Sequence, residues 1–184
     1  MKTKYRTGEK ALTPGQVDTF LSVIDNITHE GLFRLAITAG LRRDDIIRVK
    51  QSDFYPDENK LLYTEKKKKN RIREIYLPDS TVKTLKQICN VYSSETYLFP
   101  GRSNGHISSK TAYNLFQKYL KRAGIENKPF HALRATCIKL CQAKGWTPEQ
   151  TAEHVGDKIS TTQEHYLTPS KAEMQETAKE KNLL

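Results

Sequence analysis

Residues 51–78 place the tightest limit on the fold, because they have the pattern of strands in a chain whose other patterns are mostly helical. The segment QSDFYPDENKLLYTEKKKKNRIREIYLP reads in order as strand, Pro-Asp-Glu-Asn turn, strand, basic turn and strand. Runs rich in β-branched and aromatic residues that are separated by short polar turns predict strands that pair with their neighbours. We therefore expect a small antiparallel sheet in the middle of the chain.

Helical patterns occupy most of the remaining sequence. The first begins at Thr13, a candidate N-cap, with Pro14 at the first helical position and Gln16 completing a capping box. A largely apolar helix follows and ends at Gly40. The fold class is therefore mainly α with a small antiparallel β-sheet (α+β), in one domain without internal repeats. Further helices are expected over residues 44–50, 79–92, 108–125, 130–145 and 147–156.

An excess of positive charge points to a polyanionic partner. The 184 residues include 31 Lys and Arg against 21 Asp and Glu, a formal net charge of +10. Nucleic acid is the first candidate and an anionic membrane surface the second. No apolar run approaches the roughly 20 residues of a membrane-spanning helix, and the basic leader 1–12 lacks the apolar core of a signal peptide. We expect a cytoplasmic, nucleoid-associated protein, and a virus- or plasmid-encoded origin is compatible with this.

The strongest basic cluster falls in the second turn of the expected sheet. Charge of one sign at this density must face either solvent or a polyanion, so the turn is a solvated hairpin tip or a contact with a phosphate backbone. The phosphate contact is favoured, because the mutual repulsion is costly unless something offsets it. The cluster consists of Lys66, Lys67, Lys68, Lys69, Arg71 and Arg73.

The cysteines are expected to be reduced thiols in the core. Cys89, Cys137 and Cys141 are odd in number, and the last two have helical i, i+4 spacing instead of a CxxC spacing. No matching cluster of His and Cys stands near them. A metal site is therefore not expected.

Several segments, taken in order, resemble the tyrosine recombinase (phage integrase) family. TAGLRRDDIIRVKQSDF resembles the first arginine box of that family, with Arg42 as the matching residue and Asp45 at the acidic position. YTEKKKKNRIREIYLP resembles the lysine hairpin, in which Lys68 matches best and its neighbouring lysines stay open. YLFPGRSNGHISSKTAYNLFQKYLKRAGI resembles the connecting segment.

Two later segments complete the ordered set. FHALRATCIKL matches the second box of the family through His131 and Arg134. VGDKISTTQEHYL resembles the final box and has Tyr166 at the position of the nucleophile. The likeness covers residues 13–168, and several boxes in the right order are much more specific than any one of them.

The resemblance implies the catalytic-domain fold of the family and cleavage of double-stranded DNA without ATP, metal or another cofactor. Tyr166 would attack a phosphodiester to give a 3′-phosphotyrosyl link, while Arg42 and Arg134 bind the phosphate. His131 would take or relay the proton of the tyrosine, and Lys68 would protonate the leaving 5′ oxygen. A second set of cations is assigned to DNA binding: Arg43, Lys66, Lys67, Lys69, Arg71 and Arg73.

The two ends of the chain can also be compared with segments of the family. Residues 169–184 resemble the C-terminal segment that packs on a neighbouring protomer in this family, so self-association as a dimer or tetramer on DNA is expected. Members commonly carry an N-terminal core-binding domain, and the leader 1–12 is too short to be one. The sequence fits either a catalytic-domain fragment or a compact recombinase.

One position departs from the family pattern. The family usually has His, sometimes Trp, where this chain has Asp157, and an ionised carboxylate repels a phosphate instead of donating to it. Asp157 could instead orient Arg134 or a lysine, and His154, one helical turn earlier, could approach the site. A catalytically weakened DNA-binding protein would explain the Asp157 substitution and is one rival function. A type IB topoisomerase-like enzyme, which shares the chemistry, is the other, and packing is the rival role for Tyr166.

Overall fold

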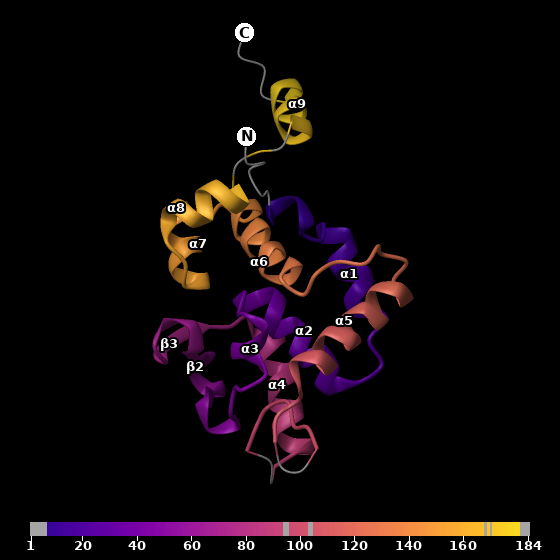
Figure 1. Cartoon of the computed structure of the whole chain (residues 1–184), viewed down its shortest axis with the longest axis vertical. Coiled ribbons are helices and arrows are strands. Elements are labelled where there is room, and N and C mark those ends of the chain that lie inside the picture. Colours follow the sequence, from indigo (N-terminus) through magenta and orange to yellow (C-terminus); the bar gives the residue numbers. More distant parts are fainter. Residues whose placement is uncertain (1–6, 94–95, 103–104, 168, 170, 181–184) are drawn as a thin grey trace.

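Helices surround one small sheet in the computed structural model, which describes residues 7–93, 96–102, 105–167, 169 and 171–180 (Figure 1). The expected fold class, mainly α with a small antiparallel sheet, is confirmed. Several predictions fall partly outside the described residues: residues 1–6 of the expected leader, 103–104 of the connecting segment, 168 of the catalytic domain, and 170 and 181–184 of the tail, and also the side chain of Lys67.

The order of elements follows the sequence pattern closely. The α-helices are α1 (Pro14–Ser22), α2 (Ile27–Ala39), α3 (Arg43–Ile46), α4 (Asp79–Val91), α5 (Ser109–Arg122), α6 (Ala132–Ala143), α7 (Pro148–Val155), α8 (Ile159–Thr162) and α9 (Lys171–Glu180). The strands are β1 (Phe54–Tyr55), β2 (Lys60–Glu65) and β3 (Arg71–Tyr76).

The sheet is antiparallel with the strand order β1-β2-β3. Leu61 lies opposite Ile75, and both side chains are buried because they face the helices. The first strand is shorter than expected, since Gln51–Asp53 form a 3-10 turn and only two residues pair as β1. The basic turn between β2 and β3 begins as a 3-10 turn at Lys66–Lys68.

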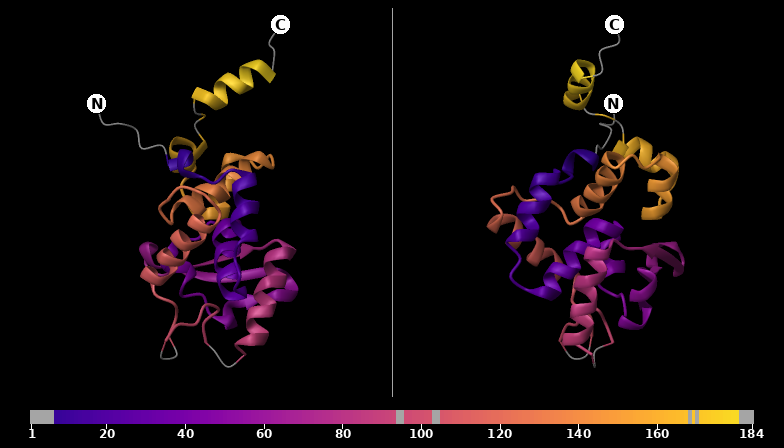
Figure 2. Two further views of the ribbon diagram at one scale, coloured as in Figure 1. Left: turned by 90° about the vertical axis from the view of Figure 1, so that its right-hand side faces the viewer. Right: turned by 180° about the vertical axis from the view of Figure 1, so that it is seen from behind.

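Helix α2 lies at the centre of the molecule and packs against both α4 and α6 (Figure 1). Aromatic side chains from three helices meet on it, with Phe20, Phe33 and Phe116 in edge-to-face and tilted contacts 5.2–5.9 Å apart. A second, smaller core joins α6 and α7 to the segment that carries Tyr166. The sheet and the α7–α8 segment lie one below the other along the same edge of the molecule (Figures 1 and 2), and Arg73 of β3 contacts Glu153 of α7.

The predicted helix ends agree with the structure at most points. The capping box of Thr13 and Gln16 is present, and an equivalent box of Thr147 and Gln150 begins α7. Helix α2 ends at Gly40 in the left-handed conformation, as expected. The helix expected over 44–50 is wrong in extent, because α3 stops at Ile46 and the chain then turns toward the sheet.

The C-terminal helix α9 projects away from the rest of the chain (Figures 1 and 2). Met174 on this helix is 52% exposed, so about half of this apolar residue faces solvent. None of the helices in the described ranges is both long and apolar enough to cross a membrane.

Candidate active site

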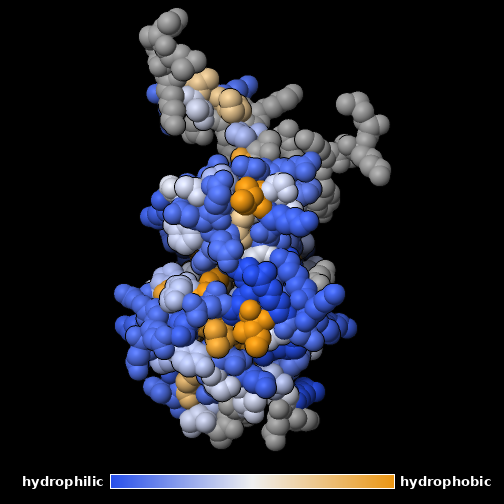
Figure 3. Space-filling model, turned by 90° about the vertical axis from the view of Figure 1, so that its left-hand side faces the viewer, coloured by the Kyte–Doolittle hydropathy of each residue, from blue (hydrophilic) through white to orange (hydrophobic). Residues whose placement is uncertain are grey.

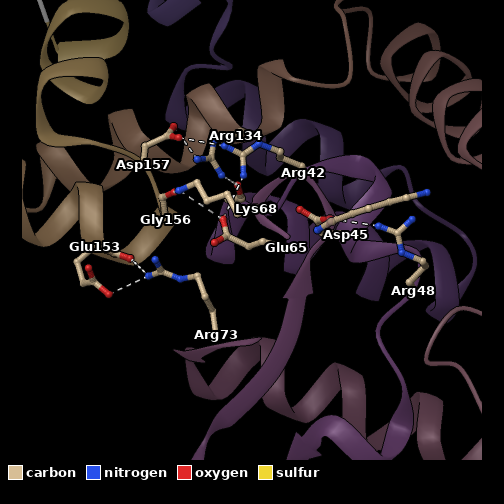
Figure 4. Close-up of polar contacts among 12 residues, drawn as sticks. Arg42, Asp45, Arg48, Glu65, Lys68, Arg73, Arg134, Glu153, Gly156 and Asp157 are labelled. Carbon is tan, nitrogen blue, oxygen red and sulfur yellow. Dashed lines mark hydrogen bonds and ion pairs between the residues drawn. The ribbon is translucent and has the colours of Figure 1, made fainter. Parts of the chain in front are cut away.

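Two arginines from distant parts of the chain share one carboxylate. Arg42 precedes α3, Arg134 lies in the first turn of α6, and Asp157 follows the end of α7 (Figure 4). Nη2 of Arg42 donates to Oδ1 of Asp157 at 3.0 Å, and Nη2 of Arg134 donates to Oδ2 at 2.6 Å. Three elements are thereby fixed around one cluster of charges.

Burial makes this cluster electrostatically strong. Arg134 is only 2% exposed, and its Nη1 also donates to the carbonyl oxygen of Gly40 at 2.6 Å. Burial alone would raise the pKa of Asp157, but the positive charges of Arg134 and Arg42 outweigh it and hold that pKa below its ordinary value. Burial lowers the pKa of Arg134, and Asp157 more than compensates. Both groups are therefore charged at neutral pH.

Lys68 joins the cluster from the basic turn. Its Nζ donates to the carbonyl oxygen of Gly156 and lies 3.9 Å from Oε1 of Glu65 (Figure 4). Gly156 has φ +71°, and a Cβ there would come within 2.9 Å of the Glu65 carboxylate, so glycine is required for this approach. The lysine turn is thus connected directly to the end of α7.

Glu65 is a member of the site that the sequence analysis missed. The residue is fully buried, and its Oε1 accepts from Nη1 of Arg42 at 3.2 Å. Its Oε2 is buried without a hydrogen-bond partner in the part of the chain that the structure describes. The alternation of β2 could have revealed it, because Leu61, Tyr63 and Glu65 all point inward.

Tyr166 lies against His131, with its hydroxyl oxygen 2.5 Å from Nε2 of the imidazole. The tyrosine lies in a π-helical turn, Gln163–Leu167, and is 5% exposed. The turn packs on residues 7–10, where a Cβ on Gly8 would come within 2.7 Å of the carbonyl oxygen of Tyr166. This π-helical turn was not predicted from the sequence.

The protonation states of this pair suit a proton transfer. Burial raises the pKa of Tyr166 above its ordinary value, and the charge of Arg134 offsets only part of the increase. His131 is exposed on one side, yet loss of solvent around its ring and the charge of Arg134 lower its pKa to about 4. At neutral pH the tyrosine is therefore protonated and the histidine is neutral, so the hydroxyl donates to Nε2.

The cations assigned to DNA binding do not all lie together. Arg43 and Lys66 line a groove beside the site, together with Arg42 and His131. Lys69 and Arg71 are exposed in the turn and on β3. Figure 3 shows the side of the molecule on which β2, β3 and α7 lie, and strongly hydrophilic side chains gather there at mid-height.

Arg73 and His154 occupy other surroundings. The side chain of Arg73 is 7% exposed, and its Nη2 donates to the backbone carbonyl and to Oε1 of Glu153 (Figure 4). Arg73 therefore connects β3 to α7 and does not face solvent. Nε2 of His154 lies 2.7 Å from the carbonyl oxygen of Thr38, so His154 does not reach the arginine cluster.

The three cysteines are free thiols, as expected, but the premise about their neighbours is wrong. The fold brings His154 to Cys137 and Cys141, so that one ligand atom of each lies within 4.8 Å of the others. The sequence could not reveal this cluster, because the packing of α7 on α6 creates it.

Replacing Asp157 by alanine should lower the free energy of unfolding at pH 7 by about 3 kcal/mol, because Arg134 would stay buried and charged without its carboxylate. Since the pKa of Asp157 is lowered, its contribution is complete above an unfolded pKa of about 3.9 and is lost as the pH falls through the folded value. Urea denaturation of both proteins at pH 7 measures the difference.

The exposed Asp18 on α1 provides the matched control. Asp18→Ala should change the free energy of unfolding by less than about 0.5 kcal/mol. Equal losses in the two variants would show that Asp157 is not a stabilising partner of the arginines.

Comparison with known proteins gives consistent matches. The family model described as "Phage integrase family" matches residues 10–173. A putative integrase/recombinase, y4eF, of Sinorhizobium fredii is 24% identical over 160 residues, which cover 85% of this chain and 62% of that protein. Tyrosine recombinase XerC of Caldanaerobacter subterraneus subsp. tengcongensis is 28% identical over 141 residues, which cover 72% of this chain and 39% of that protein.

Solved structures share the fold. The crystal structure of XerA recombinase superposes with a TM-score of 0.82 at 18% identity, over 95% of this chain and 65% of that one. The XerH site-specific recombinase bound to its difH substrate gives a TM-score of 0.76 at 18% identity, over 92% of this chain and 53% of that one. The chain thus spans less than two thirds of the length of these relatives.

Proposed function

Because the chain belongs to the phage integrase family, we propose that it is a tyrosine site-specific recombinase that cleaves and rejoins double-stranded DNA through Tyr166. One observation carries the proposal: the hydroxyl of Tyr166 is hydrogen-bonded to Nε2 of the neutral His131. The positive charges of Arg134 and Arg42 act on the same hydroxyl. A packing role for Tyr166 explains the burial of its ring but not this arrangement.

Arg42 and Arg134 bind the scissile phosphate in this proposal. A phosphodiester carries a full negative charge, and more charge gathers on its non-bridging oxygens in the transition state. Guanidinium groups suit that task, because they stay charged and bind phosphate through two parallel N–H donors. Asp157 orients both guanidinium groups, and Glu65 also accepts from Arg42. Each guanidinium has five N–H donors, so donors remain for the phosphate.

The proton of Tyr166 passes to Nε2 of His131 as the phenolic oxygen attacks phosphorus. The bond from phosphorus to the 5′ oxygen breaks, and that oxygen takes a proton from Lys68. The products are a 3′-phosphotyrosyl link and a free 5′ hydroxyl. Attack by the 5′ hydroxyl of a partner strand reverses these steps, so the bond energy is retained and neither ATP nor a metal is needed.

The partners in this proposal are DNA and further copies of the chain. Arg43 and Lys66 beside the site, with Lys67, Lys69 and Arg71 in the basic turn and on β3, contact the phosphate backbone. Arg73 supports the turn from inside, since it is paired with Glu153. The tail 169–184 packs on a neighbouring protomer, and its projecting helix α9 supports this assignment (Figure 2).

A catalytically weakened DNA-binding protein is the second candidate, and Asp157 is the observation that favours it. The carboxylate takes up donors of both arginines that a phosphate would otherwise use. Such a protein would bind DNA without forming a covalent adduct. A type IB topoisomerase-like enzyme would form the adduct but would not join two defined sites.

Relaxation of supercoiled plasmid, in EDTA and without ATP, tests the proposed function. The recombinase should relax the plasmid and leave protein–DNA adducts that resist detergent. Binding without relaxation or adducts would favour the DNA-binding protein. Relaxation without any recombination between two copies of a selected target site would favour the topoisomerase-like enzyme.

The low pKa of His131 predicts an unusual pH profile for cleavage. With a pKa of about 4, His131 remains a base at pH 5, so the rate there should be within about twofold of the rate at pH 7. A histidine with an ordinary pKa of about 6.5 would give a fall of roughly 25-fold over the same interval. Single-turnover cleavage with subsaturating enzyme reports the protonation state of His131 in the DNA-free protein. A fall in rate of roughly 25-fold between pH 7 and pH 5 would contradict the assignment of a low-pKa His131 as the base.

A further inference from the structure

A second cluster of reactive side chains lies between α6 and α7 and shares no residue with the arginine and tyrosine site. Cys137 and Cys141 project from neighbouring turns of α6, and His154 projects from the last turn of α7. The two thiols are 1% and 9% exposed, and the ligand atoms of the three residues lie within 4.8 Å of one another.

We propose that Cys137, Cys141 and His154 bind a zinc ion that joins α6 to α7. Two thiolates and an imidazole are the donor types that zinc prefers, and two of these donors come from one rigid helix. The ion would have three protein ligands and one open coordination position, and it is distinct from the DNA-cleavage chemistry, because none of its ligands contributes to the arginine and tyrosine site.

The carbonyl oxygen of Thr38 contacts both His154 and the thiol of Cys137, which donates to it at 3.5 Å and would lose its proton on binding zinc. Nε2 of His154 lies 2.7 Å from this carbonyl oxygen, so this nitrogen carries the proton and Nδ1 keeps a lone pair. A hydrogen bond from the second ring nitrogen to a backbone carbonyl is the common means of fixing a metal-binding histidine. Trp146 packs edge-on against the same ring, with the ring centres 5.0 Å apart, and further limits its rotation.

The separations of the ligand atoms can be compared with those of a zinc site. Zinc–sulfur bonds of about 2.3 Å and zinc–nitrogen bonds of about 2.0 Å place tetrahedral ligand atoms roughly 3.5 Å apart. The present separations of up to 4.8 Å are close to this value. His154 and Trp146 also line a groove between β3 and α7, and a water molecule would complete the coordination.

Binding at this position would stabilise the region that holds Asp157. His154 is followed on the same helix end by Gly156, whose carbonyl accepts from Lys68, and by Asp157, which accepts from both arginines. An ion that ties His154 to α6 would therefore limit the movement of α7 relative to the arginines. The effect is a reduction in local opening, which amide hydrogen exchange measures.

Zinc binding to the purified, reduced, metal-free chain tests the proposal directly. We expect one zinc ion per chain, and a cobalt(II) probe should give sulfur-to-metal charge-transfer absorption. At a hundredfold excess over its dissociation constant, zinc should raise Tm by about 5 °C or more and slow amide exchange in α7. Magnesium, which prefers oxygen ligands, should do neither.

Matched variants distinguish this site from other thiols. Cys141→Ser and His154→Gln should each weaken zinc binding by about tenfold or more. Cys89→Ala, which changes the half-buried thiol of α4, should bind zinc as the unmodified chain does. The proposal is wrong if the unmodified chain binds no zinc, or if Cys89→Ala weakens binding as much as the other two variants.

Discussion

Replacing Tyr166 by phenylalanine is expected to reduce DNA cleavage to an undetectable level while DNA affinity stays within about twofold. The phenolic oxygen is the atom that forms the covalent bond to phosphorus in the proposed reaction, so its removal leaves no nucleophile. Affinity is retained because the ring of Tyr166 is 5% exposed and the cations that contact DNA lie elsewhere. Plasmid relaxation and gel-shift titration at one salt concentration measure the two quantities.

The matched control is Tyr55→Phe, which removes the hydroxyl of an exposed tyrosine on β1, outside the site. This variant should cleave at the rate of the unmodified chain. Cleavage that survives in Tyr166→Phe would contradict the account, because another group would then have to be the nucleophile. Loss of binding in the same variant would indicate that Tyr166 has a structural role.

Replacing Arg134 by alanine is expected to slow the chemical step by about a hundredfold or more, because a preorganised donor for the phosphate charge is lost. The same change also leaves the carbonyl of Gly40 and one oxygen of Asp157 without their donor, so the variant should be less stable. The rate is therefore measured under single-turnover conditions at a temperature where the variant is folded, as judged by circular dichroism.

Two further arginine variants separate chemistry from folding. Arg42→Ala should give a comparable loss of rate with a smaller loss of stability, because the Arg42 side chain is 23% exposed against 2% for Arg134. Arg122→Ala, at an exposed ion pair with Asp25, should leave the rate unchanged. Rates for Arg134→Ala and Arg42→Ala that match the unmodified chain would exclude the arginines from the chemistry.

Local signals explain why most of the fold could be predicted from the sequence. The capping boxes at Thr13 and Thr147, and the glycine at the end of α2, are encoded within a few residues and appear as expected. The sheet was predictable because β-branched and aromatic residues recur in its strands and polar residues fill the turns between them. The extent of α3 was not, since the backbone of Val49 and Lys50 pairs with residues 97–98 instead of continuing the helix.

The rest of the site depends on contacts between distant segments. The positions proposed from the resemblance, Arg42, Lys68 and Arg134, lie around Asp157 and Gly156, but no local pattern predicts that one carboxylate holds both arginines. The inward direction of Arg73 and the position of His154 follow from how α7 packs. Asp157 itself was expected to repel phosphate, and its contacts support the alternative that it orients Arg134.

Mass spectrometry of the covalent adduct identifies the protein residue that becomes linked to DNA. The chain is incubated with labelled supercoiled plasmid, denatured, digested with nuclease and protease, and its peptides are identified by mass spectrometry. We expect a nucleotide to be attached through its 3′ phosphate to the peptide that contains Tyr166. The other DNA end should then carry a free 5′ hydroxyl. Attachment at another residue, or through a 5′ phosphate, would contradict the proposed mechanism.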